Sequence, residues 1–135
     1  MKGFSLIELL IAVAVTAILA TIAYPSYTQY VQQSRRSQVI ANLSGMAQWL
    51  ERQYSNSNQY PPASDTDLVA LISAAETNWY TVAYTVTTTN SRRVGYSLTA
   101  TAQGQQAQDV EKGTACSSLT FTSIGNQTPA ACWNG

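Results

Sequence analysis

The order of apolar and polar residues sets the N-terminal part of the chain apart. The run from Phe4 to Tyr24 is apolar almost throughout, and Glu8 is its only ionisable residue. At about 1.5 Å per residue, a helix of this length crosses a hydrocarbon core of about 30 Å. The run therefore predicts a membrane-spanning helix. Lys2 before it favours a cytoplasmic N-terminus with the rest of the chain outside.

Beyond this run the apolar residues recur at helical spacing over 26–54. They form one stripe of an amphipathic helix, with polar side chains between them. The stripe comprises Val39, Leu43, Met46, Ala47, Leu50 and Tyr54. Pro25 removes a backbone hydrogen bond, so it is expected to kink or break the helix between its two halves. The polar run 56–58 is expected to end it.

The last part of the chain has the composition of strands and turns. A short helix is expected at 67–72, capped by Asp65 or Thr66. Segments dense in aromatic and β-branched residues predict strands at 79–87, 94–101 and 118–122, with turns at 90–93, 103–106 and 124–126. A small antiparallel β-sheet covering the apolar stripe of the long helix gives an α+β fold.

Charge and composition exclude several classes of function. The chain has 7 Lys and Arg against 7 Asp and Glu, and no His. A balanced charge gives no general attraction to nucleic acid, and the lack of His removes the commonest general base and metal ligand. Asp65 and Asp67 are too few oxygen ligands to favour a calcium site over a loop cap. We expect no enzyme activity, no metal and no cofactor.

The two cysteines, Cys116 and Cys132, lie late in the chain without CxxC spacing. An even pair in an exported chain predicts a disulfide. Two free buried thiols are the alternative, because the prediction depends on export.

Glu8 decides how the apolar run is interpreted. A cleaved secretory signal has a shorter apolar region and no carboxylate within it. A simple membrane anchor leaves the carboxylate unexplained, because a charge at mid-membrane costs roughly 2.5–3.5 kcal/mol on insertion scales. Glu8 therefore needs a partner of opposite charge.

The segment from Lys2 to Glu8, KGFSLIE, resembles the class III signal of type IV prepilins. In that family a membrane peptidase cuts after the glycine and the new N-terminal Phe is N-methylated. The resemblance implies a cut between Gly3 and Phe4, and an ion pair between Glu8 and the Phe4 amine of a neighbouring subunit. A buried ammonium and carboxylate offset each other's desolvation better than either does alone. Pro25 is implied to mark a stretch that can melt in the fibre.

The segment from Cys116 to Trp133 is similar to the C-terminal region of PilE-type minor pilins. The resemblance implies a leader (1–3), a transmembrane and fibre-core helix (4–25) and a globular head (26–135). Within the head it implies an amphipathic helix (26–54), an αβ-loop (55–78) and a sheet with the disulfide region (79–135).

The family implies a structural minor subunit of a type IV pilus, a fibre used for adhesion, twitching motility and DNA uptake. Its expected partners are other pilin subunits, the prepilin peptidase and methylase, the inner-membrane assembly platform, and membrane lipid before assembly. The subunit is expected in the inner membrane first and in the extracellular fibre afterwards.

Other roles within the same family remain open. The chain could be the major pilin, and a type II secretion pseudopilin is disfavoured by the expected disulfide. A DNA-binding minor pilin needs a basic stripe, and its candidates are Arg92-Arg93 and Lys112. Asp109 and Glu111 lie close to Lys112, and Arg92-Arg93 is more typical of a solvated turn. Arg35-Arg36 is interpreted as a solvated face or a phospholipid contact.

Overall fold

The structure is a computed structural model that describes residues 4–134. Its internal contacts divide the chain into two units, one ending at Gln32 and the other beginning at Gln33. Helix α1 (Leu6–Ser57) runs through this boundary and continues without interruption past Pro25. The expected break is therefore wrong: Pro25 removes only one backbone donor, and the helix continues on both sides of it. The kink stays a prediction.

In the first unit, α1 points its apolar side chains outward. Leu6, Ile18 and Ile22 are each more than half exposed, and this part of α1 is long and apolar enough to cross a membrane. The two threonines within the run bond back to the helix, Thr16 to the Ala12 carbonyl and Thr21 to the Ile18 carbonyl. Their hydroxyl donors are thus satisfied without water, as a membrane interior requires.

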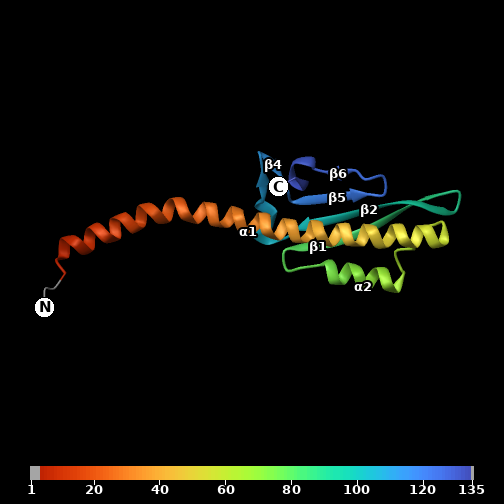
Figure 1. Cartoon of the computed structure of the whole chain (residues 1–135), viewed down its shortest axis with the longest axis horizontal. Coiled ribbons are helices and arrows are strands. Elements are labelled where there is room, and N and C mark those ends of the chain that lie inside the picture. The colour runs from red at the N-terminus through yellow and green to blue at the C-terminus, as the bar shows by residue number, and fades with distance from the viewer. Residues whose placement is uncertain (1–3, 135) are drawn as a thin grey trace. The chain divides into compact units, whose positions relative to one another are not determined.

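The second unit is an antiparallel sheet with α1 and α2 (Thr66–Ala75) (Figure 1). The strand order is β1-β2-β5-β6, and the separate hairpin β3-β4 follows a 3-10 helix (Gly104–Gln108). A second 3-10 helix (Ala130–Trp133) lies near the C-terminus. The strands are β1 (Tyr80–Thr89), β2 (Arg92–Ala102), β3 (Val110–Glu111), β4 (Thr114–Ala115), β5 (Ser118–Thr122) and β6 (Gln127–Thr128).

The core of the second unit lies between α1 and the sheet. The predicted stripe of α1 is buried there, with Val39, Leu43 and Leu50 fully enclosed and only Tyr54 left half-buried. The strands contribute alternate residues, among them Leu98 and Leu119. The α+β fold and the direction of the apolar stripe are confirmed.

Several local predictions are confirmed, and their boundaries move. Asp65, not Thr66, caps α2, since its Oδ1 accepts from the backbone N–H groups of Asp67 and Leu68. Helix α1 ends at Ser57, and Asn58 takes a left-handed conformation with φ 56°. The predicted strand 118–122 has the same bounds as β5. The predicted turn at 90–93 shrinks because β2 already begins at Arg92.

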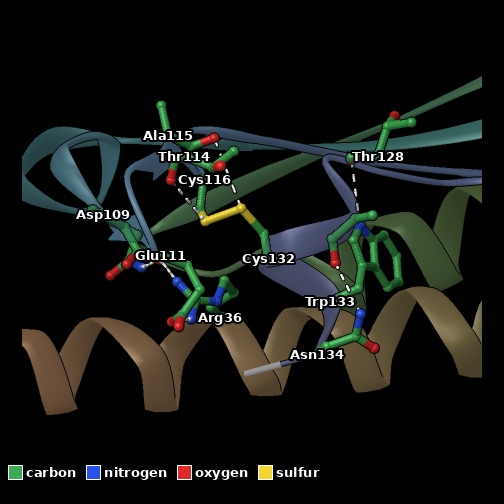
Figure 2. Close-up of a disulfide and its surroundings, with 12 residues drawn as sticks. Arg36, Asp109, Glu111, Thr114, Ala115, Cys116, Thr128, Cys132, Trp133 and Asn134 are labelled. Carbon is green, nitrogen blue, oxygen red and sulfur yellow. Dashed lines mark hydrogen bonds and ion pairs between the residues drawn. A yellow bond between two sulfur atoms is a disulfide. The ribbon is translucent and has the colours of Figure 1, made fainter.

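Arg36 contradicts the expectation of a solvated arginine pair. Its side chain is 1% exposed and donates to Asp109 at 2.7 Å and to Glu111 at 2.6 Å. Figure 2 shows it reaching from α1 toward both carboxylates. Gln106 also donates to Asp109 and to the Tyr80 hydroxyl. These long-range ion pairs therefore hold Asp109, just before β3, and Glu111, within β3, against α1.

Removing Arg36 should be strongly destabilising. In Arg36→Met, the carboxylate of Asp109 stays buried without its cation, which costs roughly 3–5 kcal/mol in comparable sites. Urea unfolding of the full-length chain in detergent, followed by tryptophan fluorescence, measures the loss. Arg52→Met makes the same change at an exposed site on the same helix and should alter the free energy of unfolding by less than about 0.5 kcal/mol. Equal effects of the two substitutions would contradict the role of the ion pair.

Candidate functional site

The N-terminal end holds the residues predicted for processing and assembly. Gly3 lies outside the described residues. Phe4 is 85% exposed. The Glu8 carboxylate accepts a hydrogen bond from the Ser5 backbone N–H at 3.0 Å, and the Ser5 hydroxyl accepts one from the Glu8 N–H at 3.3 Å. This reciprocal pair is a capping box, which satisfies free donors at the start of a helix.

The capping box gives Glu8 a role within its own subunit. Its Oε2 atom caps the helix at Ser5, which holds the carboxylate beside the chain end that cleavage after Gly3 would create. Sequence reasoning missed Ser5, although the spacing Ser-x-x-Glu before an apolar run is a recognised helix-start signal.

The disulfide joins Cys116 and Cys132, so the sequence prediction is confirmed. Both residues are buried, and Figure 2 shows the bond beside the segment that carries Trp133. The bond closes a loop with a sequence separation of 16, which in the chain-entropy model stabilises the fold by about 3 kcal/mol. It holds β5 and β6 between its two ends.

Arg92 and Arg93 lie at the end of the sheet where β1 turns into β2, here called the hairpin end. Asn90 and Ser91 form the turn in left-handed conformations, as tight hairpins require. The Arg92 guanidinium donates to the Asn58 carbonyl at 3.0 Å, and Arg93 Nε donates to the Tyr60 carbonyl. Both arginines are therefore bound to the loop that follows α1, although Arg92 remains exposed to solvent and Arg93 is half-buried.

A cluster of tyrosine rings packs around Tyr60, which lies in the loop that the two arginines contact. The ring centroids of Tyr54 and Tyr60 are 4.6 Å apart, and those of Tyr60 and Tyr96 are 4.9 Å apart. The Tyr60 hydroxyl donates to Glu51, and the Tyr84 hydroxyl donates to the Pro61 carbonyl at 2.8 Å. The first pair is stacked and the second is edge-to-face, and aromatic pairs in either arrangement contribute about 0.5–1.5 kcal/mol each beyond their buried area. The cluster fixes the loop that binds the two arginines.

Burial makes these phenols harder to ionise. Burial, and then the nearby Glu51 carboxylate, raises the pKa of Tyr60 to about 12. Burial raises the pKa of Tyr84 to about 12 and also raises the pKa of Tyr96. The fold therefore stabilises the neutral form of each phenol relative to the phenolate.

Alkaline pH should unfold the head through this cluster. Folded phenols hold their protons more tightly than unfolded ones, so their contribution to stability is complete below about pH 10. It is lost as the pH rises toward 12, the pKa of folded Tyr60 and Tyr84. Phenolate absorbance and tryptophan fluorescence, recorded together, should show late titration coupled to unfolding. Tyr60→Phe should reduce the slope of stability against pH. Titration of every tyrosine near pH 10 with the fold intact would contradict the prediction.

The remaining cations are divided between the two ends of the sheet. Arg52 is exposed on α1, less than two turns before the helix ends, beside an open groove of about 540 Å³ that Tyr96 and Gly125 help to line. Lys112 is exposed in the β3-β4 turn, near the end of the sheet opposite the hairpin end. The guanidinium carbon of Arg35 lies 3.4 Å from the ring centroid of Trp79. Among residues 4–134, the basic side chains do not form one continuous stripe.

The acidic residues near Lys112 have another partner. Asp109 and Glu111 bond Arg36, so their proximity to Lys112 in the sequence does not mean that they neutralise it. Asp65 is used as a helix cap. Within residues 4–134, no group of three or more His, Cys, Asp or Glu side chains is arranged to hold a metal ion.

Two family sequence models match the chain. The one described as "Type IV minor pilin ComP, DNA uptake sequence receptor" matches residues 25–120. The one described as "Prokaryotic N-terminal methylation motif" matches residues 1–24. No curated protein and no solved structure matches.

The fold and the N-terminal motif together define a type IV pilin. The chain belongs to the family of the type IV minor pilin ComP, described as a DNA uptake sequence receptor. The match ends at residue 120, so it covers only the first five residues of the C-terminal segment (116–133) that favoured a minor subunit from the sequence. It decides between minor and major pilin.

Membership of this family carries several consequences. The protein is anchored in the membrane by its N-terminal helix and is later assembled into the pilus with other pilins. It is a substrate of the prepilin peptidase, and its family is structural rather than enzymatic.

Proposed function

We propose that this minor pilin binds DNA at the hairpin end of its head during DNA uptake. The observation that carries the proposal is the match of residues 25–120 to a family described as a DNA uptake sequence receptor. The role requires binding and positioning of DNA in the pilus, with no catalytic step by this chain.

The arginines at the hairpin end supply the phosphate-binding groups. Arg92 is exposed, and Arg93 is half-buried with its Nε bound to a backbone carbonyl. Guanidinium groups form bidentate hydrogen bonds with phosphate and suit nucleic-acid recognition better than lysine does. Arg52, near the C-terminal end of α1, adds a third positive charge on this part of the head.

The overall charge argues for a local contact. One cation, Lys2, and one acid, Glu8, lie in the first 24 residues, so the charges of the remaining chain also balance. A neutral head gives little long-range attraction, and DNA affinity must come from a few well-placed groups.

Replacing Arg92 and Arg93 by Gln should weaken DNA binding and its dependence on salt. The full-length chain in phosphatidylcholine nanodiscs is titrated into labelled duplex DNA at several salt concentrations, and fluorescence anisotropy gives the affinity. The slope of log K against log salt is negative, and loss of two phosphate contacts makes it shallower by about 2. Lys112→Gln, at the opposite end of the sheet, is the matched control and should leave the slope unchanged.

Two results would count against the proposal. One is the lack of saturable binding to any duplex at about 50 mM salt, where phosphate contacts are strong. The other is a Lys112→Gln variant that loses as much affinity as the arginine variant. Selection from a random-sequence duplex library tests sequence recognition separately, because a receptor for a particular uptake sequence must enrich one motif.

We also propose that Glu8 pairs with the N-terminal amine of Phe4 on a neighbouring subunit in the fibre. The capping box supports this by holding the carboxylate at the helix start, close to the chain end where the amine appears. Such a pair, once removed from water, sets the axial position of one helix against the next because only one register satisfies both charges.

Glu8→Ala should leave membrane insertion intact, because it makes the helix more apolar, and should lower incorporation into pili. Immunoblots of the membrane fraction and of sheared fibres measure the two quantities. Glu8→Gln keeps the shape and part of the cap but loses the charge, so it should show the same defect. Normal amounts of either variant in sheared fibres would contradict the ion pair.

A further inference from the structure

The turn between β5 and β6 (residues 123–126), here called the β5-β6 turn, presents an apolar side chain to solvent. Ile124 in this turn is 80% exposed, whereas the other exposed large aliphatic side chains of the described second unit are less than half exposed; they are Val69, Val94 and Val110. A single exposed aliphatic side chain is common on protein surfaces. The surroundings of Ile124 therefore decide what it does.

Hydrogen bonds hold the β5-β6 turn in one shape. The Gly125 N–H donates to the Thr122 carbonyl at 2.9 Å, and the Asn126 N–H donates to the Thr122 hydroxyl at 3.1 Å. Gly125 has a φ of 80°, a conformation that suits glycine and leaves no side chain directly after Ile124. Isoleucine is branched at Cβ, so its χ1 angle is restricted as well. Ile124 is thus a stiff apolar tip.

The β5-β6 turn lies at the hairpin end, among the arginines proposed to bind DNA. The Ser123 N–H donates to the Tyr96 carbonyl at 3.0 Å, which places the turn beside β2, three residues from Arg93. Figure 1 shows the β5-β6 turn and the β1-β2 turn at the same end of the sheet. The turn also lines the open groove of about 540 Å³ together with Arg52. Ile124 therefore has arginines near it along β2 and across the groove.

This set of groups is complementary to the minor groove of duplex DNA. Proteins that bind there insert apolar side chains, isoleucine among them, between two base pairs, and contact the base edges with Asn, Gln, Arg or Lys. Asn126 and Gln127 follow Ile124 closely and are exposed. Glu51 is an acidic residue in the groove lining, and its carboxylate accepts a hydrogen bond from the Tyr60 hydroxyl. The arginines supply the charge that phosphates on both sides of an inserted side chain require.

We propose that Ile124 inserts between two base pairs from the minor groove and kinks the duplex, while the arginines of the hairpin end bind the flanking phosphates. The inference rests on the proposed function and adds the residue that selects the sequence. Kinking costs least at flexible pyrimidine–purine steps such as TA. A head without net charge thereby gains specificity from the deformability of the DNA. The cost of unstacking is offset by burial of Ile124 and by the contacts that bent DNA makes with the head.

The test uses the full-length chain in phosphatidylcholine nanodiscs and two duplexes of about 18 base pairs, roughly 60 Å long at about 3.4 Å per pair. One has a single central TA step within flanks free of other pyrimidine–purine steps, and the other has AT at the centre, so their composition is the same. Fluorescence anisotropy gives the affinity, and energy transfer between dyes at the two ends reports bending. The unchanged chain should bind the TA duplex about fivefold or more tightly and should raise its energy transfer.

Substitutions of Ile124 separate insertion from phosphate binding. Ile124→Ser changes an exposed position, so the unfolding midpoint should stay the same. This variant should bind both duplexes equally and without bending, and its salt dependence should be unchanged because no phosphate contact is lost. Ile124→Met keeps an apolar side chain that can insert, so it should retain the preference and the bending. Val110→Ser, near the opposite end of the sheet, is the matched control and should behave as the unchanged chain does.

The outcomes distinguish this inference from the proposed function. Lack of saturable binding to either duplex at about 50 mM salt would overturn both. Binding that depends on Arg92 and Arg93 but shows equal affinity for the two duplexes and no bending would overturn insertion alone. Bending and a TA preference that persist in Ile124→Ser would also overturn it. Loss of Ile124→Ser from sheared fibres, with DNA bending intact, would assign the side chain to a contact with a second copy of the chain.

Discussion

Burial of one stripe of α1 against the sheet is the interaction on which the head depends. Val39, Leu43 and Leu50 are completely enclosed there, whereas the apolar side chains before Tyr24 are exposed on every side. One helix thus changes from apolar all round to apolar on a single face. This change decides that its first part requires lipid or other helices, and that its second part requires its own sheet.

Features with a short sequence period were predictable. The stripe of α1 follows the helical repeat, the strands follow alternation, and Asp65 acts through neighbours two and three residues away. Two-residue strands such as β3, β4 and β6 are too short to show a period. The burial of Arg36 could not be foreseen, because its partners are 73 and 75 residues away in the sequence and no local pattern reports such a distance.

The candidate sites divide in the same way. Glu8 and the disulfide were predicted from a motif and from cysteine count, and the role of Ser5 followed from a spacing that was overlooked. Arg92 and Arg93 were expected in a solvated turn, but they bond the carbonyls of residues 34 and 33 positions away. The sequence placed the charges at a turn, while the tertiary contacts with the loop after α1 decide how those side chains are held.

The bonds from Arg92 and Arg93 to backbone carbonyls have a kinetic meaning as well. A free arginine side chain has about 2 kcal/mol of rotamer entropy, and much of it is lost when the side chain binds a ligand. Here the fold has already restricted both side chains before any partner arrives. For the DNA contact proposed at the hairpin end, less side-chain entropy would then be lost on binding. The gain in affinity would appear mainly as slower dissociation of the DNA and less as faster association.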